Sequence, residues 1–424
     1  MNILIIGAGG REHAIGKKIK QSPKVNKVYC APGNPGMTID GIEQVDIHEL
    51  DHQNLIEFAK KNQITWTFVG PEQPLLNGIV DDFQAAGLKI FGPTQSAAII
   101  EGSKSFAKEL MGKFGIPTAE SENFTTFAAA KQYIEEQGAP IVIKADGLAA
   151  GKGVVVALTV EEAVQAAKEM LEDHRFGDSG KLIVVEEFLS GEEFSLLAFV
   201  NGNEIYPMPI SQDHKRAYDE DRGPNTGGMG AYTPVPQIAD ELVEEAIQKI
   251  LQPAADGMVE LGRPFVGILY AGLIATPTGP KVIEFNARFG DPETQVVLSR
   301  LKSDFVQVID ELLKGQAPSE LVWENEGYNV GVVVAAEGYP GDYLKGMPLP
   351  DFSTEDVTVY YAGVRKEEGN LVGSGGRIYL VESFGKTLTE ARTNIYTALA
   401  AKDTNQTFYR TDIGAKGLRV TSKS

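Results

Sequence analysis

The stretch Ile283–Thr294, IEFNARFGDPET, places carboxylates, an amide and a guanidinium at the end of one predicted strand. Residues two apart in an extended strand point the same way, so Glu284, Asn286 and Arg288 share one face. Glu284 and Asn286 offer the oxygen ligands that Mg²⁺ prefers, and Arg288 adds a planar fork for phosphate or carboxylate. The pattern predicts a metal and anion site. This stretch alone leaves open an edge strand with a solvated polar face.

A glycine loop between two predicted strands gives a second candidate for an anion site. It lies in APIVIKADGLAAGKGVVVA, with Lys144 ending the first strand and Lys152 in the loop. Gly147, Gly151 and Gly153 would let backbone N–H groups close over phosphates while the lysines supply charge. The stretch lacks the Walker spacing, and a simple hairpin is the alternative.

Two neighbouring stretches also fit a nucleotide. Lys104 begins a predicted helix after the cap residue Ser103. A cation is unfavourable at this end of the helix dipole, so a bound anion would explain the lysine, and chance placement is the alternative. LIVVEEFLSGEEFSLLAFV predicts a hairpin turning at Ser190-Gly191. Its carboxylates would need water or a ligand's hydroxyl and amine groups as partners.

The opening MNILIIGAGGREHAIGKKI predicts a buried strand, a glycine turn and a helix whose N-terminus could receive a phosphate. The dinucleotide-binding fingerprint needs a glycine where Glu12 stands, which weakens a nicotinamide interpretation. Strands predicted at 65–69 and 89–91 extend a parallel sheet and end in Gly-Pro. Their loops should border the same crevice as the glycine turn, because ligands bind at the carboxyl ends of such strands.

The segment SQDHKRAYDEDRGPNTGGMGAYTPVP is a long region of turn-forming and charged residues, including Asp213 and Lys215. Loops of this length inside a compact domain are usually functional or disordered. One long helix over 241–261 and a strand over 265–276 then lead to the metal-binding stretch. From Asn329 onward, valine-rich strands and a helix over 388–401 predict a separate small α+β domain.

Composition sets the outer bounds. At about 150 residues per domain, 424 residues predict roughly three domains. A formal charge of −19 argues against nucleic acid or an anionic membrane as partner. The single cysteine, Cys30, allows no internal disulfide and suits a reducing cytoplasm. We find no run long enough for a signal peptide or a membrane span.

Several stretches together resemble one family: GAGGREHA, KADGLAAGKGV, EEFLSGEEFS, QDHKRAYDEDRGPNTGGMG and EFNARFGDPETQ. They are similar to the phosphoribosylamine–glycine ligases of the ATP-grasp superfamily, in order along nearly the whole chain. The resemblance implies a Rossmann-like open parallel sheet over 1–102 and an ATP-grasp domain over 103–325, with a lid at about 120–190. A small α+β domain would cover 326–424. The implied reaction joins glycine to 5-phosphoribosylamine through glycyl phosphate, with ADP as product.

The resemblance also implies roles for individual residues. Catalysis would involve Arg288, Asp213 and Lys215, and Glu284 and Asn286 would bind Mg²⁺ or Mn²⁺. ATP would contact Lys104, Lys144, Gly147, Gly151, Lys152, Gly153, Glu186, Glu187, Phe188, Leu189 and Glu193. Glycine and phosphoribosylamine would contact Gly9, Gly10, Arg11, Glu12, Asn34, Gly228, Asp291 and Glu293. We expect small-molecule partners only and a monomer.

Three rival functions stay open at this point. A nicotinamide dehydrogenase would rest on the first glycine turn alone. A non-enzymatic nucleotide-binding regulator would keep the ATP site without needing Arg288 or the loop around Asp213. A related ATP-grasp ligase would use another acid. ATP turnover that depends on a chosen acid and amine separates them.

Overall fold

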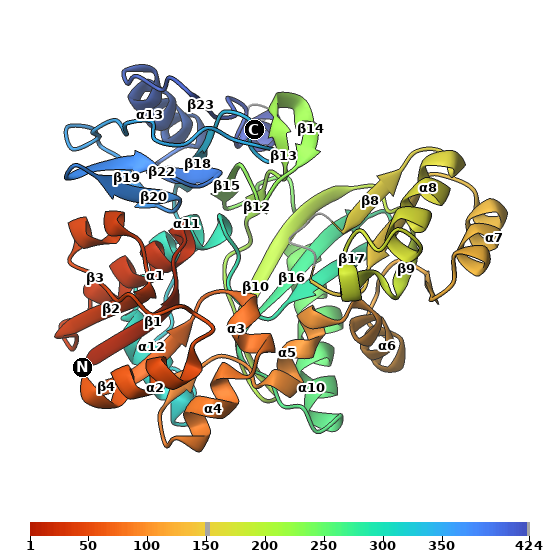
Figure 1. Cartoon of the computed structure of the whole chain (residues 1–424), viewed down its shortest axis with the longest axis horizontal. Coiled ribbons are helices and arrows are strands. Elements are labelled where there is room, and N and C mark those ends of the chain that lie inside the picture. The colour runs from red at the N-terminus through yellow and green to blue at the C-terminus, as the bar shows by residue number, and fades with distance from the viewer. Residues whose placement is uncertain (149–152, 422–424) are drawn as a thin grey trace.

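The computed structural model describes residues 1–148 and 153–421. Its N-terminal part is a five-stranded parallel sheet in the order β3-β2-β1-β4-β5 (Figure 1). The strands are β1 (Asn2–Gly7), β2 (Lys27–Pro32), β3 (Glu43–Gln44), β4 (Ile64–Val69) and β5 (Ile90–Phe91). The helices are α1 (Gly10–Lys20), α2 (His52–Lys61), α3 (Glu72–Leu76), α4 (Ile79–Ala85) and α5 (Gln95–Gly102). The predicted parallel sheet is confirmed, and Ile3–Ile6 are fully buried, as expected for a strand covered on both faces.

A four-stranded antiparallel sheet forms the middle of the molecule, in the order β11-β10-β16-β17. Its strands are β10 (Glu192–Asn201), β11 (Glu204–Pro207), β16 (Val266–Thr276) and β17 (Gly279–Asn286). The prediction of a single continuous helix over 241–261 is wrong, because the helix is interrupted. A π-helical turn, Ile247–Leu251, separates α9 (Asp240–Ala246) from α10 (Gln252–Glu260). Pro253 follows this turn and has no N–H to donate to a regular helical bond.

The lid is a separate small layer with its own core of alanine, isoleucine and valine side chains. Its antiparallel sheet runs β6-β9-β7-β8, with β6 (Ser121–Phe124), β7 (Ile141–Ala145), β8 (Val154–Ala157) and β9 (Ile183–Glu187). Helices α7 (Phe127–Gln137) and α8 (Val160–Leu171) complete it. Figure 1 shows the lid projecting sideways from the rest of the chain. The predicted pair of strands around the glycine loop is confirmed as β7 and β8.

The hairpin predicted around Ser190-Gly191 is wrong, because its two strands lie in different sheets. β9 belongs to the lid and β10 to the central sheet. Gly191 has a φ of +156°, and a Cβ added there would lie 1.9 Å from the Ala275 carbonyl oxygen. The chain therefore passes from lid to central sheet through a point where a side chain does not fit.

The C-terminal sheet takes two strands from the long charged segment. Its order is β12-β15-β18-β22-β19, and β23 (Thr407–Phe408) pairs with β18. The strands are β12 (Gln212–Asp213), β15 (Gly230–Thr233), β18 (Tyr328–Ala336), β19 (Thr358–Tyr361) and β22 (Arg377–Gly385). Helices α13 (Leu388–Ala400) and α14 (Ala415–Thr421) pack on this side. The segment predicted as a loop is thus built into the C-terminal sheet at both ends.

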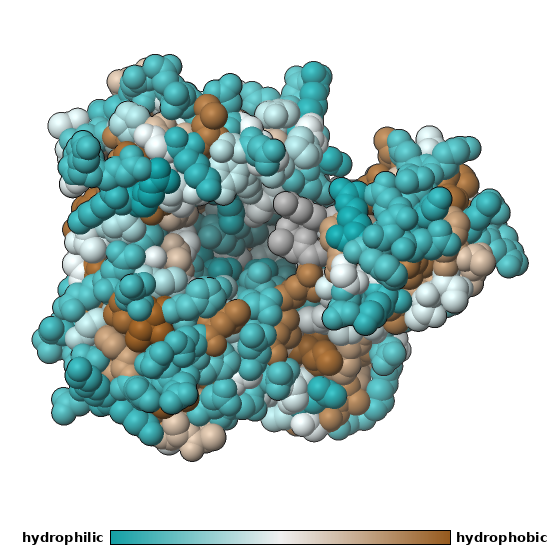
Figure 2. Space-filling model, viewed as in Figure 1, coloured by the Kyte–Doolittle hydropathy of each residue, from teal (hydrophilic) through white to brown (hydrophobic). Residues whose placement is uncertain are grey.

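The remaining elements connect these sheets. Two hairpins, β13 (Arg216–Tyr218) with β14 (Arg222–Asn225) and β20 (Val364–Glu367) with β21 (Asn370–Gly373), stand outside them. Helices α6 (Lys104–Phe114), α11 (Glu293–Val297) and α12 (Phe305–Leu313) link the domains. Figure 2 shows the visible face hollowed at its centre, between the N-terminal domain, the C-terminal domain and the lid.

A buried carboxyl between domains gives a stability prediction. Burial raises the pKa of Glu382 to about 7, and its Oε1 accepts a hydrogen bond of 2.6 Å from Asn329 Nδ2. A carboxyl whose pKa is raised in the folded state stabilises the fold at low pH, and that stability is lost as pH rises toward the folded pKa. We expect the wild-type protein to lose on the order of 3 kcal/mol of unfolding free energy between about pH 4.5 and 8, and Glu382→Gln not to show this loss. Urea unfolding of both proteins across this range checks it, and parallel curves would contradict it.

Candidate active site

The end of β17 carries the polar face that the sequence indicates. Glu284 is surrounded by cations, and although burial acts to raise its pKa, Lys215, Lys144, Lys104 and Arg288 together lower it. Asn286 Oδ1 lies 3.4 Å from Arg288 Nη2, so the amide and the guanidinium share one side. An ionised carboxylate and an amide oxygen are a fitting donor pair for Mg²⁺, which keeps waters or phosphate oxygens as its other ligands.

Arg288 is held by two carboxylates that the sequence did not single out. Its Nη2 lies 2.9 Å from Glu101 Oε1, and its Nε lies 3.2 Å from Glu72 Oε2. Burial acts to lower the pKa of Arg288, but these carboxylates outweigh it and raise the pKa. Glu101 also accepts a 2.8 Å hydrogen bond from the Ala287 backbone N–H. These two carboxylates therefore fix the orientation of the Arg288 guanidinium, as expected for a group that binds an anion.

Three lysines converge beside the same strand. Lys144 Nζ is 2.8 Å from Glu186 Oε2 and donates to the Ile283 carbonyl at 3.1 Å. Lys108 Nζ is 3.3 Å from the other oxygen of Glu186. Lys104 Nζ donates to the Gly147 carbonyl at 3.2 Å, and burial lowers its pKa. Lys108 was missed, although its place one turn after Lys104 on α6 is a signal that the sequence carries.

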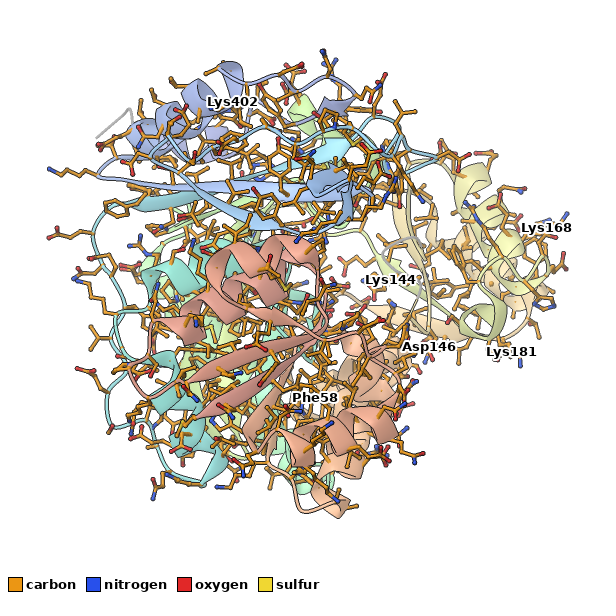
Figure 3. All side chains as sticks on the ribbon, turned by 60° about the vertical axis from the view of Figure 1, so that its left-hand side comes forward. Phe58, Lys144, Asp146, Lys168, Lys181 and Lys402 are labelled. Carbon is orange, nitrogen blue, oxygen red and sulfur yellow. The ribbon has the colours of Figure 1, made fainter. Side chains whose placement is uncertain are left out.

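The lid loop is fastened to the start of α6. Asp146 accepts a 2.7 Å hydrogen bond from the Ser105 N–H, and Ser103 Oγ caps the helix at the Phe106 N–H as predicted. Lys144 and Asp146 face the body of the molecule, whereas Lys168 and Lys181 lie on the lid's outer side (Figure 3). Gly147 packs so closely that an added Cβ would lie 2.3 Å from Ser179 Oγ. Gly151 and Lys152, predicted to contact ATP, lie outside the described residues.

The residues predicted to hold adenine lie at the end of β9, where Glu186 and Glu187 are its last two residues and Phe188 and Leu189 follow it. The side chain of Glu186 is occupied by the two lysines, and Glu187 Oε2 accepts from the Glu120 N–H at 3.3 Å. Phe188 is 38% exposed, which leaves an apolar surface for a ring. Contact with adenine would therefore fall to Phe188, Leu189 and their backbone groups rather than to the Glu186 carboxylate.

A small pocket brings together residues from three strands and the long charged segment. It is lined by Glu193, Phe194, Ser195, Asp213, Lys215, Gly272, Leu273, Ile283 and Glu284. Lys215 Nζ is 3.5 Å from Glu193 Oε2 and 3.6 Å from Asp213 Oδ1. Partial burial acts to lower the pKa of Lys215, but the Asp213 and Glu193 carboxylates raise it well above its usual value. Lys215 is therefore a permanent cation close to Glu284.

Glu293 is a second buried carboxyl beside this pocket. Burial, reinforced by the Asp213 charge, raises its pKa to about 7. Its Oε1 accepts a 2.9 Å hydrogen bond from Tyr270 Oη, whereas Oε2 is buried without a hydrogen-bond partner among the described residues. Such an oxygen is available to a ligand's N–H or O–H group.

The first glycine turn packs against Asp291, and two backbone N–H groups at this turn donate hydrogen bonds to carboxylates. Gly9 N–H donates to Glu12 Oε2 at 2.7 Å, and Arg11 N–H donates to Asp291 Oδ2 at 3.3 Å. Arg11 Nη1 reaches the Phe289 carbonyl at 3.0 Å. The side chain of Glu12 fills the turn so fully that a Cβ on Gly70 would lie 1.9 Å from Oε1. This turn offers carboxylates and close backbone, which suit hydroxyl and amine groups.

Asn34 and Gly228 occupy supporting places around the turn. The Asn34 amide donates to the carbonyls of Ala8 and Tyr361 at 2.8 and 3.0 Å, so it ties the turn to the C-terminal domain. Gly228 has a φ of +121°, and a Cβ there would lie 2.4 Å from Pro292 Cδ. Both residues shape the site from outside, and their predicted contact with substrate stays a prediction.

Two further observations concern where in the structure a ligand or a metal ion could bind. A wider pocket of about 770 Å³ lies in the C-terminal domain beside Tyr361, but none of its lining residues is a predicted site residue. Over the part of the chain that the structure describes, no group of three or more histidine, cysteine, aspartate or glutamate side chains could hold a metal. Only a site completed by other ligands fits Glu284 and Asn286.

Models of one protein family match three successive parts of the chain. The descriptions are phosphoribosylglycinamide synthetase N domain at 1–101, ATP-grasp (A) domain at 102–294 and C domain at 329–416. A curated phosphoribosylamine–glycine ligase from Streptococcus pyogenes serotype M18 is 56% identical over 99% of this chain and 100% of its own.

Solved structures agree with this match. A crystal structure of phosphoribosylamine–glycine ligase from Thermotoga maritima has a TM-score of 0.85 and 33% identity, covering 97% of this chain and 100% of the other. The biotin carboxylase domain of Hydrogenobacter thermophilus 2-oxoglutarate carboxylase, solved with MgADP, has a TM-score of 0.76. It is 14% identical and covers 96% of this chain and 91% of its own, so it shows the fold alone.

Proposed function

The chain belongs to the phosphoribosylglycinamide synthetase family, the phosphoribosylamine–glycine ligases, and from that membership we propose how its residues carry out the reaction. It is an ATP-grasp ligase of purine biosynthesis that joins glycine to phosphoribosylamine. The observation that carries the assignment of roles is the meeting of Glu284, Arg288 and Lys215 beside the lysines of the lid and α6.

The first step activates glycine. One carboxylate oxygen of glycine attacks the γ-phosphorus of ATP, the bond from phosphorus to the ADP oxygen breaks, and glycyl phosphate forms. Negative charge crowds together in this step, so cations must stabilise the transition state. Lys104 and Lys144 lie where the lid meets the body and would hold the phosphates. Arg288, fixed from behind by two glutamates, would face the transferring group.

Lys215 and Asp213 would serve the acid substrate. The Lys215 ammonium is a permanent cation beside Glu284 and attracts the glycine carboxylate toward the phosphates. Asp213 is the nearby carboxylate that can receive the glycine ammonium group, while Glu193 keeps its proposed contact with ATP. This arrangement would place both ends of glycine, and a larger side chain would meet the crowded pocket wall.

Glu284 and Asn286 would hold Mg²⁺ or Mn²⁺ together with phosphate oxygens, and the metal would offset charge on those phosphates when bound. The donor set fits because Glu284 is kept ionised by the surrounding cations. Two protein ligands are the usual complement for Mg²⁺ bound to a nucleotide.

The second step forms the amide. The amine nitrogen of phosphoribosylamine attacks the glycyl carbonyl carbon, the bond to the phosphate oxygen breaks, and the nitrogen loses a proton. The ribose hydroxyls and the amine of phosphoribosylamine would bind at the first glycine turn and its neighbour, at Gly9, Gly10, Arg11, Glu12 and Asp291. Glu293, with a pKa of about 7 and one free oxygen, is suited to accept that proton. Exclusion of water by the lid would protect the acyl phosphate until the amine arrives.

Isotope labelling tests this reaction. Glycine carrying ¹⁸O in its carboxyl group should yield ¹⁸O-labelled phosphate and ADP, because one carboxylate oxygen leaves with the phosphoryl group. Alanine and serine should react far less, although a single methyl group gives only about 1–3 kcal/mol of discrimination. Mass spectrometry of the phosphate decides the matter. Unlabelled phosphate, AMP as product, or turnover without glycine would each contradict the assignment.

Some wider features also belong to this proposal. Domain limits at 102/103 and 325/326 stay a proposal beside the family matches at 1–101, 102–294 and 329–416, and Gln212–Asp213 and Gly230–Thr233 join the C-terminal sheet. Among the described residues no helix has both the length and the apolar character that crossing a membrane requires. The lone Cys30 suits the cytoplasm. A monomer would suffice, because one chain supplies every assigned residue.

A further inference from the structure

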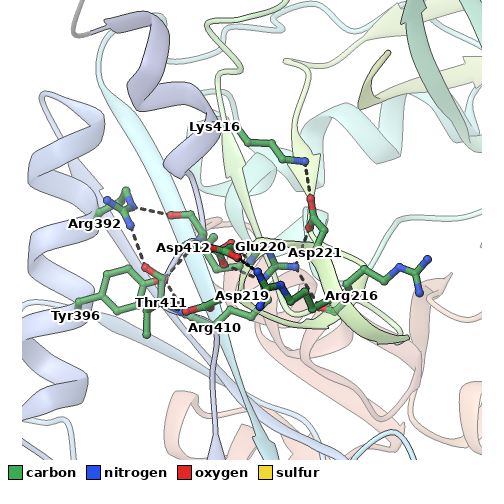
Figure 4. Close-up of polar contacts among 12 residues, drawn as sticks. Arg216, Asp219, Glu220, Asp221, Arg392, Tyr396, Arg410, Thr411, Asp412 and Lys416 are labelled. Carbon is green, nitrogen blue, oxygen red and sulfur yellow. Dashed lines mark hydrogen bonds and ion pairs between the residues drawn. The ribbon is translucent and has the colours of Figure 1, made fainter. Parts of the chain in front are cut away.

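The C-terminal segment Arg410–Asp412 contacts the β13–β14 hairpin through several hydrogen bonds, outside the pocket that Lys215 lines. Arg410 has a side chain only 1% exposed, and its Nη1 donates to the Arg216 carbonyl at 3.1 Å and to Asp221 Oδ1 at 3.0 Å. Its Nε and Nη2 meet the two oxygens of Asp412 at 2.8 and 2.7 Å. Figure 4 shows this guanidinium at the centre of the contact. Arg410 and Arg216 are 194 positions apart, so this is a link between domains.

The tip of the hairpin is held by the same segment. Asp219 accepts hydrogen bonds from the N–H and Oγ1 of Thr411 at 2.8 and 2.5 Å. The Glu220 N–H donates to Asp412 Oδ2 at 2.9 Å, and Lys416 pairs with Asp221 at 2.9 Å. Every contact joins the hairpin to the C-terminal domain. These contacts tie a hairpin that stands outside the sheets to the C-terminal domain.

Lys215 needs such support because its own side-chain contacts are weak. Its side chain is 42% exposed, and its Nζ lies 3.5 and 3.6 Å from its carboxylate partners, longer than good hydrogen bonds. Lysine is a flexible chain with a point charge, so its position depends on where its backbone is fixed. The carbonyl that Arg410 binds belongs to Arg216, the next residue. The Lys215 carbonyl accepts from the N–H of Thr226, directly after β14, at 2.7 Å.

We propose that Arg410 is a positioning residue for the ligase reaction, which acts through the Arg216 carbonyl and Asp221 to hold Lys215 beside Asp213 and Glu193. This inference rests on the role proposed above for Lys215. The buried guanidinium satisfies four acceptors with one rigid fork, and a lysine at this position could not bind them all. A small movement of the hairpin would carry Lys215 away from the acid substrate.

The test compares Arg410→Lys with Arg300→Lys as a matched control. Arg300 is likewise buried, and its guanidinium donates to the carbonyls of Glu324, Glu326 and Gly327 and to Asn329 Oδ1 at 2.8 to 3.2 Å, none of them in the hairpin or in Arg410–Asp412. We expect Arg410→Lys to lower kcat about tenfold with the KM for ATP within about twofold, because misplacing one group affects chemistry more than nucleotide binding. Arg300→Lys should stay within about twofold of the wild type in both constants.

A double-mutant cycle separates positioning from general loss of structure. In a Lys215→Met background, Arg410→Lys should change the residual kcat by less than about twofold, since it acts through the missing lysine. Equal tenfold losses in both backgrounds, a wild-type kcat in Arg410→Lys, or an equal loss in Arg300→Lys would overturn the inference. Asp221→Ala, at a half-exposed position, repeats the cycle if Arg410→Lys does not fold. A wild-type kcat in Lys215→Met alone would instead refute the proposed role of Lys215, and the inference with it.

Discussion

Glu284→Gln should lower kcat by about a hundredfold to a thousandfold and raise the Mg²⁺ concentration needed for half-maximal rate. The substitution keeps the shape of the side chain but removes a negative charge that lies among Lys104, Lys144, Lys215 and Arg288. Divalent cation binding should weaken for the same reason. Phosphate release over a Mg²⁺ titration measures the first effect, and Mn²⁺ binding followed by electron paramagnetic resonance measures the second.

The fold should survive this change. Removing a carboxylate from a group of cations costs some stability, but the substituted amide side chain would keep the same place on β17 beside Gly272. Glu245→Gln provides the control, since Glu245 on α9 pairs with Lys249 of the following π-helical turn and neither residue lines the pocket. Unchanged Mg²⁺ dependence and unchanged Mn²⁺ binding in Glu284→Gln would remove β17 from the metal site.

Arg288→Met should lower kcat by about a thousandfold and also destabilise the protein by about 3–5 kcal/mol. The catalytic loss follows from removing the cation that faces the transferring phosphoryl group. The stability loss has a separate cause, since Glu101 would remain buried without its partner. Steady-state kinetics and urea unfolding measure the two losses independently.

The two effects of Arg288→Met can be separated by changing its partner as well. In Arg288→Met/Glu101→Gln the buried charge is gone, and the glutamine oxygen can still accept from the Ala287 N–H. Stability should largely return while kcat stays low. Recovery of activity together with stability would show that Arg288 supports the fold and takes no direct part in the reaction.

Local patterns predicted the strand β17 with its polar face and the capped start of α6. Alternation of Glu284 and Asn286 is a property of one strand, although Arg288 lies two residues beyond its end, and Ser103 with Gly115 marks both ends of one helix. The same reasoning missed Glu101 and Glu72, because they meet Arg288 only when α5 and α3 fold against β17. Nothing in their immediate sequence distinguishes them from surface glutamates.

The error at Ser190-Gly191 has a similar origin. Two alternating runs joined by a short glycine turn are typical of a hairpin, and local rules favour that interpretation. The structure instead sends β9 and β10 into different sheets, because β9 pairs with β6 and β7 while β10 pairs with β11 and β16. Strand pairing over long sequence distances is decided by the cores on either side, which a short window of sequence does not contain.

The course of the chain at this crossing also bears on how such enzymes diversify. The lid leaves the body just before β6 and returns just after β9, and the Glu187 N–H meets the Glu120 carbonyl there at 2.9 Å. Its entry and exit are therefore adjacent, and the lid is an inserted module with its own core. Insertions and deletions inside such a module leave the surrounding sheets in register. The lid can thus change in length and surface during evolution without disturbing the sheets of the body.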